Sequence, residues 1–246
     1  MLSHLPFYHE HFRKYVTAFG TCFNDLYIVR KSRSETNPIE KKIKVPLYYS
    51  TKTKQLDRLL EKDESRGWEN EFPRMSFEIT GIQYASDRKE NSMHYIAKTG
   101  DGKSRVFSYS PAPYDFSFQL VVYSVYQEDC FQIVEQILPF FQPEYNVKVK
   151  EVPSLGLTRD ITIILNSVNT EFDQASEYAE VTNLFTATMD FTLKGYFFGP
   201  AEDKPVITNL EANIWHMPEG EKPLSAYKVE GDVATREITL EEWEDY

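Results

Sequence analysis

A possible phosphate-binding loop is the first segment of this chain whose residue types could do chemistry. Residues 97–104, AKTGDGKS, end in Gly102-Lys103-Ser104, the triplet that holds nucleotide phosphates and Mg²⁺ in such loops. The motif also needs a glycine five residues before Gly102, where Ala97 stands, and a helix whose N-terminus receives the phosphate. Because the following RVFSYS alternates like a strand, we interpret the Asp-Gly pair as a hairpin turn and expect no nucleotide site.

Two further pairs of residues offer metal or acid–base chemistry. His9 and His11 share a face only if the chain is extended there, because residues two apart on a helix point about 200° away from each other. No third ligand type lies at a useful spacing, so we expect no zinc site. Glu128 and Asp129 are adjacent carboxylates, but the start of a helix explains acidic residues there without catalysis.

The two cysteines, Cys22 and Cys130, lie among apolar neighbours and have no histidine near them in the sequence. This pattern predicts buried, reduced thiols rather than nucleophiles. No GxSxG motif occurs either. The sequence therefore nominates no catalytic residue, no metal ligand and no cofactor, and we expect the protein not to be an enzyme.

The elements that would position any site begin with residues 114–143, whose hydrophobic period changes partway. Apolar side chains fall on every second residue from Phe116 to Val122, which predicts a strand. From Asp129 the period becomes helical, and Asp129 with Gln132 three residues later suits a helix N-terminus. Prolines at 139 and 143 would end or kink this helix. Its expected apolar stripe consists of Cys130 or Phe131, Val134, Ile137 or Leu138, and Phe141.

Other segments predict more strands than helices. A helix is expected at residues 12–19 with Gly20 as its end, and a short one at residues 56–60. Pro46 makes the strand at 43–49 an edge strand or a bulged one. Residues 86–104 are polar and predict a long hairpin tip or mobile loop. The remaining strands are expected at residues 26–29, 75–84, 161–165 (covered on both faces), 181–193 and, more weakly, 206–215.

This order of elements defines the expected fold class. Strands come first, a helix follows in the middle, and strands come after, without the regular alternation of a doubly wound fold. We therefore predict an α+β fold with a mostly antiparallel sheet and short helices that cover one face. Residues 1–236 would form a single domain, and the acidic segment 237–246 either a short docked strand or a tail that orders on binding.

The charges of this 246-residue chain are unevenly distributed. The net charge is −11, with 19 Lys and Arg against 14 Asp and Glu in residues 1–110 and 3 against 10 in residues 211–246. An acidic end on a chain with a basic first half suits contacts within an assembly, although solubility alone explains it equally. It does not suit a general nucleic-acid binder. No apolar run is long enough for a membrane span, and no signal peptide is expected at the start.

Several segments carry a resemblance to a known family. They are FRKYVTAFGTCFNDLYIVR from Phe12, IKVPLYY from Ile43, PRMSFEITGIQYAS from Pro73, YQEDCFQIVEQILPFFQPEYN from Tyr126 and LTRDITIILNS from Leu157. In this order they resemble the tail sheath stabiliser and completion proteins, or tail terminators, of T-even-type contractile-tailed bacteriophages. The resemblance covers roughly residues 12–170 and is looser beyond.

The resemblance implies a structural virion protein assembled in the host cytoplasm. It implies a hexameric ring at the head-proximal end of the tail that terminates the tail tube, holds the extended sheath and offers a docking surface to neck proteins. The implied partners are copies of the same chain, the tube and sheath proteins and the neck, without a membrane or cofactor. A β-rich carbohydrate- or receptor-binding tail module is the alternative that the aromatic content, 15% of the residues, also allows.

Three sets of residues are candidates for contacts in such an assembly. An exposed strand edge that accepts a strand of the sheath is expected at Ile43, Val45, Leu47 and Tyr49. A docking tail for neck or sheath is expected at Glu241, Glu242, Trp243 and Asp245. A basic loop that either meets the phosphates of passing DNA or is simply solvated is expected at Arg88, Lys89, Lys98, Lys103 and Arg105.

Overall fold

The computed structural model describes residues 6–31, 40–55, 72–99, 104–142, 144–173, 184–205, 209–214, 225–232 and 237–243. The helix expected at residues 56–60 and the Asp-Gly turn lie outside this part of the chain. So do Lys103 and Asp245 among the candidate contact residues.

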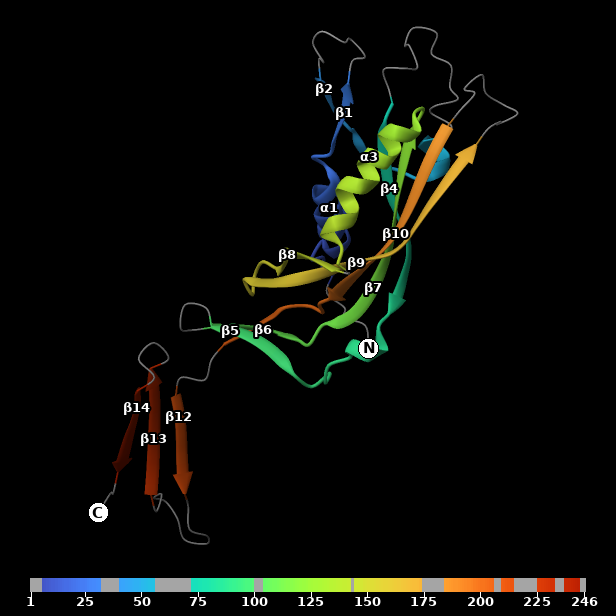
Figure 1. Ribbon diagram of the computed structural model, residues 1–246. Coiled ribbons are helices and arrows are strands. Elements are labelled where there is room, and N and C mark those ends of the chain that lie inside the picture. Colours follow the sequence, from blue (N-terminus) through green and yellow to red (C-terminus); the bar gives the residue numbers. More distant parts are fainter. Residues whose placement is uncertain are drawn as a thin grey trace.

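A six-stranded sheet forms the centre of the molecule, in the order β3-β4-β7-β10-β9-β8 (Figure 1). All neighbouring strands are antiparallel except β3 and β4, which are parallel. This arrangement confirms the predicted α+β class. The strands are β3 (Leu47–Tyr49), β4 (Arg74–Tyr84), β7 (Ala112–Ser124), β8 (Glu144–Val152), β9 (Leu157–Asp173) and β10 (Leu184–Phe197).

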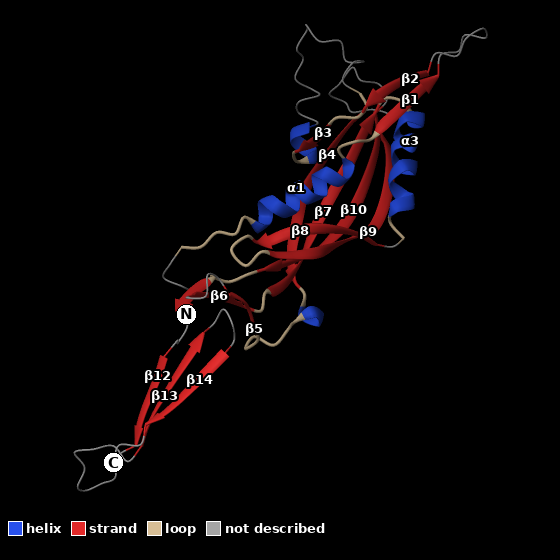
Figure 2. Cartoon of the chain, turned by 90° about the vertical axis from the view of Figure 1, so that its left-hand side faces the viewer, coloured by secondary structure: helices blue, strands red, loops and turns tan. Residues whose placement is uncertain are grey.

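Two helices, α1 (His11–Phe23) and α3 (Gln127–Ile137), cover one face of this sheet (Figures 1 and 2). The alternation of apolar and polar residues explains why, because strands with one buried face place every second side chain toward it. The opposite face is polar at its middle, where Asp190 accepts hydrogen bonds from Gln119 (3.0 Å) and Ser167 (2.8 Å) across three strands, and it carries a small buried cluster of Phe72, Val121 and Tyr123. The covered face carries Phe116, Phe118, Leu120, Val122, Ala187, Met189, Phe191 and Leu193, each 0–1% exposed.

The predicted helices form, but their ends differ from expectation. Gly20 does not end α1, which continues to Phe23. A Cβ on Gly20 would lie 3.0 Å from Cζ of Phe77, so glycine allows the helix to approach β4. Helix α3 buries Cys130, Ile133, Val134 and Ile137, whereas Phe131 and Leu138 are exposed. After Ile137 the chain continues as a 3-10 turn, Leu138–Phe140, that contains Pro139.

The N-terminus of α3 corrects another expectation. The N-cap residue is Tyr126 and makes no side-chain cap. Asp129 instead lies inside the first turn, and Gln132 accepts a hydrogen bond from the backbone N–H of Val29 (3.0 Å). Asp129 forms an ion pair with Arg30 of β1 (Tyr27–Lys31). Both side chains therefore join the helix to β1 rather than capping it.

The strand expected at residues 43–49 is divided at Pro46. Residues before it belong to β2 (Glu40–Lys44), which pairs with β1 in a separate two-stranded sheet. Residues after it form β3, the edge strand that Pro46 predicted. The segment at 161–165 also differs from expectation, because only Ile161 and Ile163 are fully buried, whereas Thr162, Ile164 and Leu165 are half-buried.

Two three-stranded sheets complete the described chain. One consists of β5 (Tyr95–Thr99), β6 (Ser104–Tyr109) and β11 (Glu202–Pro205), in the order β11-β6-β5. The other contains β12 (Asn209–Ile214), β13 (Ser225–Asp232) and β14 (Glu237–Trp243) and stands apart from the central sheet (Figures 1 and 2). Among the described helices, none is long and apolar enough to cross a membrane.

Candidate interaction surfaces

The segment that resembled a phosphate-binding loop is part of a hairpin. Strands β5 and β6 pair antiparallel with Thr99 opposite Arg105. Strand β6 follows where a phosphate-binding loop would require a helix. The hairpin prediction is therefore confirmed for the paired strands.

A buried polar cluster that sequence analysis missed joins the start of α1 to β8 and β10. Glu151 is 0% exposed and accepts hydrogen bonds from Nδ1 of His11 (3.0 Å) and the hydroxyl of Tyr15 (3.0 and 3.1 Å). Nε2 of His11 lies 3.4 Å from the backbone N–H of Phe198, which donates to it. The hydroxyl of Tyr15 also accepts from the N–H of Tyr196 (2.8 Å).

A β-bulge explains how Glu151 reaches this cluster. The pairing of β8 with β9 passes from Lys150 to Val152 and omits Glu151. A bulged residue can re-aim its side chain, and here Glu151 and Val152 are both fully buried. The main-chain carbonyl of Glu151 accepts a hydrogen bond from Nζ of Lys14 (2.8 Å). Side chains of α1 therefore donate to both the carboxylate and the main-chain carbonyl of the bulged residue.

The chemistry of this cluster is structural. Burial, together with the charge of Glu151, raises the pKa of Tyr15 well above its usual range, so the phenol stays protonated and remains a donor. Both nitrogens of His11 have protein partners. His9, whose ring centroid lies 5.6 Å from that of His11, donates from Nε2 to the carbonyl of Gly199 (2.9 Å).

The remaining groups considered for chemistry also have structural partners. Asp129 is 3% exposed and forms an ion pair with Arg30 (Nη2 to Oδ2, 2.6 Å), while Glu128 is exposed, so the two carboxylates do not converge. Burial raises the pKa of the Cys22 and Cys130 thiols from 9.0 to about 11. Such thiols stay protonated at neutral pH and react slowly. Within the described residues, no three or more His, Cys, Asp and Glu side chains are grouped to hold a metal ion.

The expected sheath-contact edge is only partly assembled. Ile43 lies on β2 in another sheet, and Val45 is 0% exposed between the two strands. Leu47 and Tyr49 lie on β3 at the edge of the central sheet. Tyr49 is 58% exposed, so this part of the edge is accessible.

The backbone of β3 has a defined free side. The carbonyl of Pro46 accepts from the N–H of Met75 (2.8 Å), and the N–H of Ser50 donates to the carbonyl of Phe77 (3.1 Å). Because backbone groups of successive strand residues point to alternate sides, the N–H and C=O groups of Leu47 and Tyr49 point away from β4. These are the groups that an added strand would pair with.

The expected basic loop is not one surface. The guanidinium of Arg88 forms an ion pair with Asp115 and lies over the ring of Tyr196. Lys89 is exposed beside it. Lys98 and Arg105 lie on opposite faces of the β5–β6 hairpin, because Lys98 pairs with Val106 and Arg105 with Thr99. The described basic residues therefore do not line a common groove.

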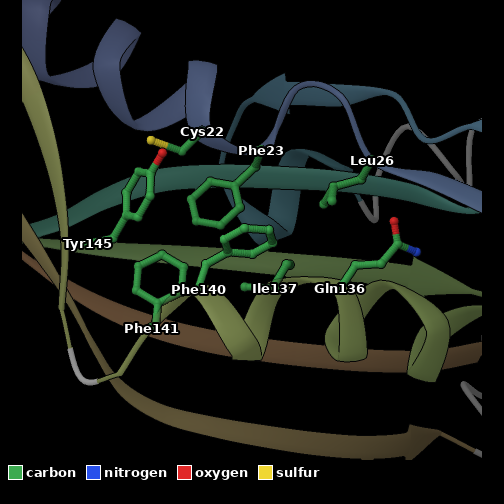
Figure 3. Close-up of a pocket in the computed structure, with 8 residues that line it drawn as sticks. All are labelled: Cys22, Phe23, Leu26, Gln136, Ile137, Phe140, Phe141 and Tyr145. Carbon is green, nitrogen blue, oxygen red and sulfur yellow. The ribbon is translucent and has the colours of Figure 1, made fainter.

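An apolar groove lies where α1, α3 and β8 meet (Figure 3). Its volume of about 200 Å³ is below the range typical of small-molecule sites. Phe140 at its rim is 66% exposed and Tyr145, on the edge strand β8, is 39% exposed. The groove suits an inserted side chain better than a small ligand. Its lining residues are Cys22, Phe23, Leu26, Gln136, Ile137, Phe140, Phe141 and Tyr145.

The candidate docking tail is a strand in its described part. Glu241, Glu242 and Trp243 belong to β14, which pairs with β13. Of the two forms expected for this segment, the structure contains the strand. The proposed domain boundary at residue 236 stays a prediction.

In the described part of the chain, the free sheet edges, the exposed aromatic side chains and the buried polar cluster with internal partners are features of a β-rich structural subunit. Comparison with known proteins specifies the family. The family of T4-like virus Myoviridae tail sheath stabilisers matches residues 6–246, and this chain belongs to that family. It is similar to the tail completion protein gp15 of Enterobacteria phage T4. The two are 28% identical in an alignment 252 residues long, which covers 97% of this chain and 90% of the phage T4 protein.

This membership confirms the resemblance found in the sequence and extends it to the C-terminal part. The protein is a structural component of the contractile tail of a T4-like virion, and it is not an enzyme. Its role is tail completion and stabilisation of the sheath.

Proposed function

We propose that six copies of the chain form a ring at the head-proximal end of the tail, where the ring terminates the tube, holds the last extended sheath layer and offers a surface to the neck. The observation that carries this proposal is the family match over residues 6–246. A closed ring needs heterologous contacts, in which different faces of one subunit meet. The central sheet supports this requirement because its two edges, β3 and β8, are different surfaces.

Imaging with assembled tail tubes tests the ring. The purified full-length protein mixed with tubes should produce six-fold rings at one tube end in negative-stain micrographs. Sedimentation of the protein alone then shows whether the ring forms before it meets the tube. Tubes that remain uncapped and continue to lengthen in the presence of the protein would contradict the proposed termination role.

The sheath contact is proposed at the free side of β3. An extended arm of the sheath protein would pair its backbone with the outward N–H and C=O groups of Leu47 and Tyr49. Many modest contacts of this kind around a ring can hold a sheath layer in its extended form. Residues Ile43 and Val45, which sequence analysis included, lie outside this contact because they belong to β2 and the core.

Replacing Tyr49 with proline should release the sheath from the ring. Proline removes one outward N–H while leaving the β4 side of β3 intact, since the groups bonded to β4 belong to Pro46 and Ser50. We expect a loss of at least about tenfold in the fraction of tails with extended sheath, from the loss of a backbone pairing site in each subunit. Electron microscopy of assembled tails measures this fraction.

The matched control is Tyr49→Ala, which removes the same ring but keeps the N–H. Rings should form on tubes with both variants. Extended sheaths on Y49P tails at the wild-type frequency would rule out strand addition at β3. An equal release by both variants would assign the contact to the tyrosine ring instead of the backbone.

The alternative of a carbohydrate- or receptor-binding module has less support. Aromatic side chains do surround the apolar groove, but Gln136 and Tyr145 are the polar-tipped side chains beside Cys22 in its lining. Sugar recognition needs several convergent hydrogen-bonding groups in such a site. Contact with DNA in the bore likewise has no assembled basic surface among the described residues to support it.

A further inference from the structure

Strands β5, β6 and β11 carry a face of aromatic and basic residues, which we call the aromatic–basic face. Tyr95 lies opposite Tyr109, and Arg105 lies opposite Lys204, and directly opposed residues of antiparallel strands share a face. Phe107 lies between them on β6. Tyr95, Tyr109 and Lys204 are 51%, 54% and 63% exposed, so this face is open to a partner.

The other face of the same sheet holds it in place. Ile96 and Val106 pack against the buried cluster of Val152, Leu155 and Phe198. The aromatic–basic face is therefore presented by a sheet anchored on the main body. An exposed but anchored aromatic surface is the kind of patch that binds other proteins.

Cations lie directly on the aromatic rings of this face. The guanidinium of Arg105 is 5.7 Å from the ring centroid of Tyr95, and Nζ of Lys204 is 4.7 Å from that of Phe107. Aromatic residues and arginine are enriched in protein interfaces. Glu202 is the acidic residue that also belongs to this face, and its carboxylate forms an exposed ion pair with Nζ of Lys204 (3.3 Å). With two basic residues against this one acidic residue, the face is still positively charged. The face therefore fits an acidic segment that also carries apolar or aromatic residues.

The C-terminal segment of this chain has that chemistry. Residues 237–246, EITLEEWEDY, contain five acidic residues and no basic one, together with Ile238, Leu240 and Trp243. Strand β14 is the outer strand of its sheet, and the contacts of β12, β13 and β14 with described elements are made mainly among themselves. In Figure 1 strand β14 lies apart from β5, and no contact of β14 with β5, β6 or β11 is among the main contacts between the described elements.

We propose that the aromatic–basic face of one subunit binds the acidic segment 237–246 of a neighbouring copy. This inference rests on the proposed ring, in which each subunit offers one different surface to each neighbour. Only residues 206–208 separate β11 from β12, so the sheet that contains β14 follows the aromatic–basic face directly along the chain. The sequence predicted a neck or sheath contact for this segment, whereas charge complementarity within the chain favours another copy of the chain.

Cross-linking of isotopically mixed rings tests the contact. Full-length protein, half of it ¹⁵N-labelled, is assembled on tubes and treated with a carbodiimide, which joins lysine to carboxylate without a spacer. Peptides that contain Lys204 should be linked to peptides that contain Glu241 and Glu242 in mixed-isotope pairs. Same-isotope pairs alone would show that the segment folds back on its own chain, and links to tube subunits instead would give it a different partner; either result overturns the proposal.

Charge reversal provides an independent measurement. The double variant Arg105→Glu, Lys204→Glu should raise the protein concentration needed to cap half of the tubes by at least about tenfold, because like charges then face each other. The double variant Glu241→Lys, Glu242→Lys should raise this concentration by a similar factor. Combining all four changes should bring it back to within about threefold of wild type. The matched control is Lys41→Glu, Lys42→Glu, which makes the same change in charge at exposed positions of β2, outside the central sheet, and should cap tubes like wild type.

The outcomes separate this inference from the proposed function. If the Arg105→Glu, Lys204→Glu variant caps tubes like wild type, or if the variant with all four changes does not regain capping, the proposed contact is wrong and the proposed ring is unaffected. If the wild-type protein does not cap tubes at all, the proposed ring itself is wrong.

Discussion

Replacing Glu151 with alanine should lower the free energy of unfolding by about 3–5 kcal/mol. The side chain is 0% exposed and accepts hydrogen bonds from His11 and Tyr15. Alanine would leave the Nδ1–H of His11 buried without an acceptor, would leave the Tyr15 hydroxyl with only the carbonyl of Tyr196, and would open a cavity next to α1. The loss would act on three elements together, because the cluster joins α1, β8 and the end of β10.

Urea denaturation followed by tryptophan fluorescence or circular dichroism measures this effect. Glu151→Gln should be less damaging, at about 1–2 kcal/mol, because the amide oxygen retains one acceptor. Glu144→Ala, on the exposed end of the same strand, is the control and should stay within about 0.5 kcal/mol of wild type. A Glu151→Ala variant as stable as the Glu144→Ala variant would show that the cluster does not stabilise the fold.

Replacing Gly195 with alanine should be the second strongly destabilising change, by about 2–3 kcal/mol. A Cβ at this position would lie 2.6 Å from Cε2 of Phe116 and 2.7 Å from Cε2 of Tyr15. Both rings are 0% exposed, so neither can move aside into solvent. Displacement of Tyr15 would also disturb its hydrogen bonds to Glu151 and Tyr196.

The control for this change is Gly199→Ala. A Cβ on Gly199 would meet no atom within 4 Å, so its unfolding free energy should match wild type. Combining Gly195→Ala with Phe116→Leu should destabilise less than the sum of the two single changes, since the smaller side chain makes room for the added methyl group. Strict additivity of the two would argue that the Cβ of residue 195 does not press against Phe116.

The two predictions concern the same junction, and the junction bears on function. Helix α1 is held to the sheet by Tyr15 and Glu151 at one end and approaches β4 closely at Gly20. The edge strand β3 pairs with β4, and the apolar groove is formed partly by the end of α1. Variants that loosen α1 should therefore be assayed for stability before any loss of sheath retention is assigned to a contact.

Local patterns in the sequence determined most of the secondary structure. Alternation predicted β4, β7 and the buried positions of β10, because a strand with one covered face repeats every two residues. Helical spacing predicted α1 and α3, and Pro46 predicted an edge strand because proline cannot donate to a sheet ladder. The quoted segments also indicated the family, which the match over residues 6–246 confirms.

The tertiary structure alone decided which polar groups work together. His11 and Glu151 are 140 residues apart, and a bulge that no periodicity reveals turns Glu151 into the core. Asp129 and Gln132 looked like a helix cap but bind β1, and Lys98 and Arg105, expected in one basic loop, lie on opposite faces of a hairpin. Spacing along a chain predicts neighbours within one element, whereas contacts between elements depend on register and packing, and these exist only in the folded molecule.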